Sequence, residues 1–225
     1  MGYPFPMQRL AGTVFWLALF AIAMALVEAT VVVHLRAIYH PGDARVLFPL
    51  VLMSHRDLGL ELGREAATVV MLLALAWITE RSAGRRFAIF VYLFGMWDLF
   101  YYVWLKLVID WPRSWLEWDV LFLIPWPWFG PWITPATIAL LFALWGGRVL
   151  LSGKEPLFTG RALLLFLAGT AAALTAFLLP GAVLLPGGET AFDGYRPGAF
   201  PWGLWSGGML LMAGGLWLTL PGKTK

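Results

Sequence analysis

Six stretches of about 20 mostly apolar residues divide the chain, and each is long enough for an α-helix to cross a membrane. They cover residues 10–35, 57–78, 87–108, 131–151, 162–179 and 202–220. Only 13% of the residues are charged, about half the share of a soluble domain. The chain is 225 residues long, which leaves no room for a separate soluble domain. We therefore predict a single all-α integral membrane domain over residues 1–225, with six transmembrane helices.

The residue inventory excludes several classes of chemistry. The chain has no cysteine, so its own residues cannot supply thiol catalysis, disulfide exchange or iron–sulfur ligation. No histidine lies in the middle of a span, so heme is not expected. No array of basic and aromatic residues suggests nucleic acid as a partner. The first apolar stretch is too long for a signal-peptide core and is expected to stay in place as a signal anchor.

The distribution of charge favours one orientation in the membrane. With the N-terminus in the cytoplasm, the inner side carries nine Lys or Arg and two acids, and the outer side carries seven basic residues and eleven acids. Inner loops are enriched in Lys and Arg, and the compact turn at residues 80–86, with Arg81, Arg85 and Arg86, is the clearest example. We predict that both termini are cytoplasmic, in a bacterial inner membrane. The polar residues then lie on the periplasmic or extracellular side.

The segment between the third and fourth spans is rich in proline and tryptophan. Pro125, Pro127 and Pro131 cannot lie in one unbroken helix, and the tryptophans around them suit the membrane interface. Non-helical backbone at this depth must be covered by protein or face water. We expect a short interfacial or re-entrant helix on the outer face that covers something beneath it.

Small residues recur in the last span. Ser206-Gly207-Gly208 and Ala213-Gly214-Gly215 are seven residues apart, which places them on one helical face. Small residues on one face allow two helices to approach closely. The pattern predicts close helix packing.

Acidic residues in the first two spans are candidates for a functional site, because a carboxylate in a membrane is costly unless it is paired, hydrated or functional. Glu28 lies about two helical turns before the outer end of the first span, with no neutralising neighbour. In the second span, Glu61, Glu65 and Thr68 follow helical spacing and form one stripe, with Arg64 as a nearby cation. Asp57, at the start of the same stripe, is expected to cap the helix.

The third span carries the deepest acid of the chain. Asp98 is followed on the same side by Tyr101, Tyr102 and, two turns away, Lys106. These residues could form a hydrogen-bonded path from the outer surface, or the tyrosines could simply anchor the helix. Asp119, which lies between Trp118 and an apolar run, is a further candidate.

The same residues could bind a divalent metal ion through carboxylate and imidazole groups. The candidate ligands are Glu28, Glu61, Glu65 and Asp98, together with His34 and His55 beside the first outer loop. The Glu-x-x-His pattern of di-iron bundles is missing, since Arg64 follows Glu61 at the third position. The metal hypothesis therefore rests on the available donors and not on a motif.

Three functions are compatible with this pattern. The first is a membrane-embedded enzyme that acts on an amphiphilic substrate, a lipid or a quinone. Its catalytic residues would be Glu28, Glu65 and Asp98, and its substrate-binding residues would be Arg64, Tyr101, Tyr102 and Asp119. The second is a non-catalytic subunit of a larger membrane or respiratory complex, and the third is a proton- or cation-coupled carrier, for which six spans could form half of a homodimer. All three predict that the side-chain oxygens of Glu28, Glu65 and Asp98 converge within about 8 Å, a separation that one ion, proton network or basic side chain can bridge.

Overall fold

The computed structural model describes residues 7–220 and is mostly helical. Its helices are α1 (Met7–Tyr39), α2 (His55–Thr79), α3 (Ala83–Ile109), α4 (Ile133–Ser152), α5 (Gly160–Ala182) and α6 (Trp202–Thr219). Each overlaps one predicted span. In the described range, α1 to α5 are long and apolar enough to cross a membrane. Helix α6 does not reach that threshold, because glycines and tryptophans make up much of its 18 residues, so its crossing stays a prediction.

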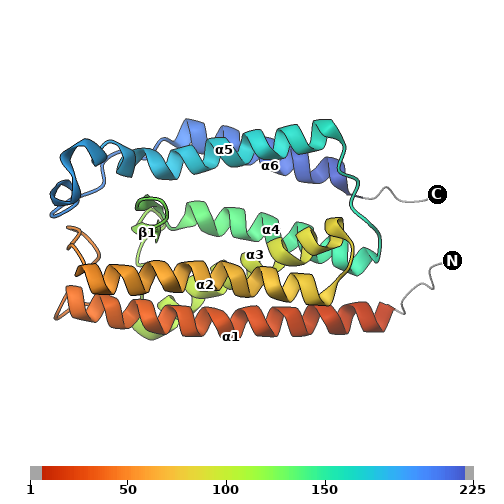
Figure 1. The fold of residues 1–225 in the computed structure, drawn as a ribbon, viewed down its shortest axis with the longest axis horizontal. Helices are drawn as coiled ribbons and strands as arrows, with labels where there is room; N and C mark the ends of the chain where they lie inside the picture. Colours follow the sequence, from red (N-terminus) through yellow and green to blue (C-terminus); the bar gives the residue numbers. More distant parts are fainter. Residues whose placement is uncertain (1–6, 221–225) are drawn as a thin grey trace.

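The helices lie side by side along the long axis of the molecule, with α3 and α4 between the α1–α2 side and the α5–α6 side (Figure 1). Helix α1 begins, and α6 ends, at the end of the bundle that also holds the α4–α5 connection, where the Leu157 N–H donates to the Thr219 carbonyl at 2.8 Å. Which side of the membrane each end faces stays a prediction. Lys223 and Lys225, which contribute to the predicted inner charge, lie outside the described residues.

A β-hairpin replaces the helix that we predicted between the third and fourth spans. Strand β1 (Trp118–Phe122) runs antiparallel to β2 (Trp128–Pro131), with Asp119 opposite Gly130. The prediction was wrong because the apolar run at residues 120–124, just before Pro125, is too short for a helix. Two short strands instead satisfy each other's backbone groups. Pro125 and Pro127 lie in the connection, where no ladder hydrogen bond is needed.

Three segments close the hairpin end of the bundle, and we call them together the roof: residues 40–54, the hairpin, and residues 183–201. Leu50 pairs with the last of these segments, since its N–H donates to the Tyr195 carbonyl at 2.9 Å and its carbonyl accepts from Gly194 at 2.8 Å. Gly194 has a φ of +71°, a conformation that favours glycine. The ring of Phe129 is fully buried and contacts both Phe48 and Tyr195. The hairpin thus links the two loops.

Helix α2 begins one turn earlier than the predicted cap. The Ser54 hydroxyl accepts the Asp57 N–H at 3.1 Å, so Ser54 is the cap and Asp57 lies in the first turn. Asp57 accepts a hydrogen bond from the Tyr39 hydroxyl at 2.6 Å instead. This contact fixes the end of α1 to the start of α2. The sequence signal was a serine three residues before an acid, the spacing of a capping box.

The small residues of the last span pack against α5, as predicted. A Cβ atom at Gly208 would lie 2.8 Å from the Ala173 nitrogen, and one at Gly215 would lie 2.6 Å from the Phe166 nitrogen. Gly207 and Gly214 face open space. Helices α5 and α6 therefore approach through one glycine face, as the spacing of seven residues indicated.

Candidate functional site

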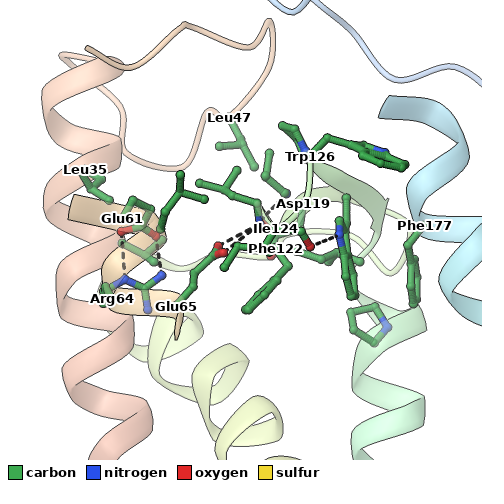
Figure 2. A pocket seen from close by; sticks show the side chains of 18 of the residues that line it. Leu35, Leu47, Glu61, Arg64, Glu65, Asp119, Phe122, Ile124, Trp126 and Phe177 are labelled. Atoms are coloured by element: carbon green, nitrogen blue, oxygen red, sulfur yellow. Dashed lines mark hydrogen bonds and ion pairs between the residues drawn. The ribbon is translucent and has the colours of Figure 1, made fainter. Parts of the chain in front are cut away.

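A cavity of about 840 Å³ lies beneath the roof, and residues of all six described helices line it. Helices α3 and α4 contribute Trp97, Asp98 and Phe142, while α2 and α5 lie on opposite sides. Figure 2 shows Glu61, Arg64 and Glu65 on one side of the cavity and Phe177 of α5 on the other. The cavity is therefore amphipathic, with a charged wall and a large apolar remainder.

The charged wall is organised around Arg64. Its guanidinium group forms ion pairs with Glu28 of α1 and Glu61 of α2, and its Nε donates to Glu61 at 2.9 Å. Glu28 is 9% exposed and Glu61 is 7% exposed, so the arginine neutralises two buried carboxylates. Two acids therefore already share the charge of Arg64, and its predicted role in substrate binding stays a prediction.

Glu65 lies one turn further along α2 and connects that helix to the hairpin. It is 5% exposed, and both of its carboxylate oxygens lie 3.0 Å from the Leu123 N–H, which they accept. Leu123 directly follows β1. Within residues 7–220, Glu65 forms no ion pair with a lysine or arginine, so its partner is a backbone dipole and not a cation.

Asp98 borders the cavity from the middle of α3. It has neither a hydrogen bond nor an ion pair in the part of the chain that the structure describes, and the charges that act on it are those of two other acids, Asp119 and Glu28. Lys106, expected on the same stripe, pairs instead with Asp110 at 2.7 Å. The predicted polar path therefore stops short of Lys106, and Asp98 remains an unpaired carboxyl group.

Asp119 pairs with a residue that sequence reasoning missed. Arg36, near the end of α1, donates from Nη2 to Asp119 at 3.0 Å, and the Tyr102 hydroxyl donates to the other oxygen at 3.2 Å. Arg36 is 4% exposed and Asp119 is 1% exposed. The guanidinium group also lies over the Trp111 ring, 4.1 Å from its centroid, in a cation–π contact. Arg36 follows Glu28 by eight residues and shares its helical face, which is the signal that could have identified it.

We expect wild-type protein to lose thermal stability, relative to the Asp119→Asn variant, as the pH rises from about 4 to about 6. Burial raises the pKa of Asp119 from 3.8 to about 6, against the opposing effect of Arg36. In this window the folded protein binds more protons than the unfolded chain, so stability falls as the pH rises. Unfolding midpoints of both proteins in detergent, from pH 4 to pH 8, test this.

Asp43→Asn is the matched control for this pH series. Hydrogen bonds from Arg45 lower the pKa of Asp43 to about 2, so its titration contributes little above pH 4. If the midpoint of wild type minus that of Asp119→Asn stays constant or rises with pH, the expectation is contradicted.

The predicted metal site does not assemble. Across residues 7–220, no group of three or more histidine, cysteine, aspartate or glutamate side chains could hold a metal ion. Glu28 and Glu61 bind Arg64 instead, and the exposed His34 has its Nδ1 2.7 Å from the Thr30 carbonyl of its own helix. His55 lies at the cavity edge, exposed at the start of α2. An arginine therefore supplies the positive charge that we expected from a metal.

The other predicted site residues all line the cavity, and their convergence on one point stays a prediction. Glu28, Glu65 and Asp98 come from three different helices and all line the cavity. The same cavity is lined by the four residues predicted to contact a substrate: Arg64, Tyr101, Tyr102 and Asp119. Their chemical roles stay predictions.

No protein family model, curated protein or solved structure matches this chain.

Proposed function

We propose that the chain is a membrane-embedded enzyme that binds an amphiphilic substrate, a lipid or a quinone, in this cavity. One observation carries the proposal: a large apolar cavity holds two carboxyl groups, Glu65 and Asp98, that have no cationic partner among the described residues. The volume of about 840 Å³ lies in the range of small-molecule sites. The polar end of the substrate would lie at the charged wall and its chain among the apolar residues.

The two carboxyl groups suit acid–base chemistry. Glu65 is held in place by the Leu123 N–H, whereas Asp98 is unpaired, and two carboxyl groups in different environments can divide the roles of acid and base. Apolar walls would exclude water from the reaction. Glu28, which we predicted to be catalytic, is better assigned to holding Arg64.

The packing of the helices supports access from the membrane. Helix α2 packs against α3, and α5 packs against α6 and β2, but α2 and α5 do not pack extensively against each other. Both nevertheless line the cavity, α2 with Val69 and α5 with Leu174. An amphiphile could therefore enter sideways from the lipid, with its chain between these helices.

The placement in a bacterial inner membrane, with the roof on the outer side, is part of the proposal. Arg81, Arg85 and Arg86 lie at the α2–α3 turn, which is at the opposite end from the roof (Figure 1). This arrangement agrees with positively charged inner loops.

The ion pairs also favour a second candidate, a non-catalytic subunit. Arg64 joins α1 to α2, and Arg36 joins α1 to the hairpin, which is what a purely structural polar group would do. A carrier is less favoured, because Leu17, Ala21 and Leu93 form a continuous buried apolar core beyond the cavity. A transport path would have to cross that core.

Lipid and quinone profiles of cells that produce the protein test the proposal. Wild type should change the abundance of at least one amphiphile, and Asp98→Asn should slow that change about 100-fold or more, the usual effect of removing a general acid or base. Asp43→Asn, at a roof residue that pairs with Arg45 and does not line the cavity, should behave as wild type. Equal profiles for wild type and Asp98→Asn, with a partner that copurifies at fixed stoichiometry, would favour the subunit.

A further inference from the structure

We infer that the polar end of the cavity selects a neutral, hydroxyl-bearing lipid over one with an anionic phosphate head. This inference rests on the proposed function, since it assumes that an amphiphile occupies the cavity. It follows from the balance of charged side chains around the cavity and from which of them are already paired.

Acids outnumber bases in the lining. Among the described lining residues, the arginines are Arg36 and Arg64, and no lysine is present. The acids are Glu28, Glu61, Glu65, Asp98, Asp119 and Glu189. A site for a phosphate group normally shows the reverse balance, with more arginine and lysine side chains than acids.

The charge of each arginine is already paired with an acid, although Nε and Nη1 of Arg36 have no hydrogen-bond partner among the described residues. Arg64 is shared by Glu28 and Glu61, and Arg36 is paired with Asp119. His40 also lines the cavity, but burial and the nearby Arg36 lower its pKa, so it is neutral near pH 7. A phosphate group in this cavity would lose its hydration without gaining an arginine or lysine whose charge is not already paired.

The unpaired groups suit a hydroxyl instead. Asp98 has no partner in the described range. Glu65 accepts only the Leu123 N–H, so its carboxylate can accept further hydrogen bonds. A hydroxyl group both donates and accepts hydrogen bonds, so it matches a carboxyl group in either protonation state. Figure 2 shows Glu65 directed into the space beneath the hairpin, toward Phe122 and Ile124, so a small polar head would lie between charged and apolar surroundings.

Two lipids with identical chains separate the alternatives. 1,2-Dioctanoylglycerol ends in a hydroxyl, and 1,2-dioctanoyl phosphatidate carries a phosphate in its place. Binding of each to the purified protein in neutral detergent can be measured by native mass spectrometry. We expect the glycerol lipid to bind at least about tenfold more tightly, a modest ratio for rejection of an unpaired charge.

Variants locate the binding and identify its cause. Asp98→Asn removes a group that can carry a negative charge but keeps a hydrogen-bonding group, so it should strengthen phosphatidate binding and reduce the ratio. Leu174→Trp should weaken both lipids by filling the cavity between α2 and α5. Leu164→Trp is the control, because Leu164 lies on the same helix and is 68% exposed. Size-exclusion profiles and unfolding midpoints establish that each variant is folded.

Each result has a distinct meaning. Phosphatidate binding as tight as, or tighter than, dioctanoylglycerol would overturn this inference and leave the proposed function standing. Binding of neither lipid would overturn the inference together with the proposal that the substrate is a lipid. Preferential binding of dioctanoylglycerol that neither Leu174→Trp nor Asp98→Asn alters would place the lipid outside the cavity and overturn the inference as well.

Discussion

Replacing Arg64 with methionine should destabilise the folded protein by about 3–5 kcal/mol, because it leaves buried carboxylates without their cation. Glu28 and Glu61 would lose the guanidinium group that both contact. Two negative charges would then face each other in apolar surroundings, where charge is most costly. The unfolding midpoint of the purified variant in detergent measures the loss.

Two further variants separate this effect from simple loss of a side chain. Arg56→Met removes an exposed arginine from the same helix and should change stability little, as most surface substitutions do. Adding Glu28→Gln and Glu61→Gln to Arg64→Met removes the unpaired charges and should recover much of the stability. A triple variant as unstable as Arg64→Met would contradict the electrostatic explanation.

Replacing Gly208 with valine should destabilise the α5–α6 pair by about 1–3 kcal/mol, the usual cost of forcing atoms into a packed interface. A Cβ atom at Gly208 would lie 2.8 Å from both the Ala173 nitrogen and the Gly169 carbonyl oxygen. These are backbone atoms and cannot rotate away, so the helices would have to separate. Unfolding midpoints in detergent report the effect.

The adjacent glycine provides the control for this substitution. Gly207 has no atom within 4 Å of the position that a Cβ would occupy. Gly207→Val introduces the same side chain into the same helix, so any change in helix propensity is shared. Equal destabilisation by both substitutions would show that the close approach of α5 and α6 is not the cause.

The helices could be predicted from the sequence because span length is a local property. A run of about 20 apolar residues is long enough to cross a bilayer, whatever lies elsewhere in the chain. The hairpin could not be predicted in this way. Its strands are short, and Val120 opposes Phe129 across a turn built from prolines, so the strands exist only because they pair with each other.

The candidate site was predictable where its residues share one helix. Glu61, Glu65 and Thr68 follow helical spacing, and all three lie on the buried face of α2. Glu61 pairs with Arg64 on the same helix, but other contacts of the site join distant segments: Leu123 is 58 residues from Glu65, and Asp119 is 83 residues from Arg36. Spacing along one helix carries no information about such contacts, which is why Arg36 was missed.

The pairing of Leu50 with Gly194 and Tyr195 ties a segment near the start of the chain to one near its end. If residues 40–54 or residues 183–201 moved away alone, these two main-chain hydrogen bonds would break. The freed N–H and C=O groups would then need water as a partner. A molecule that enters between α2 and α5, the route proposed above, would disturb neither loop. We therefore expect solutes dissolved in the bilayer to reach the interior more readily than solutes dissolved in water.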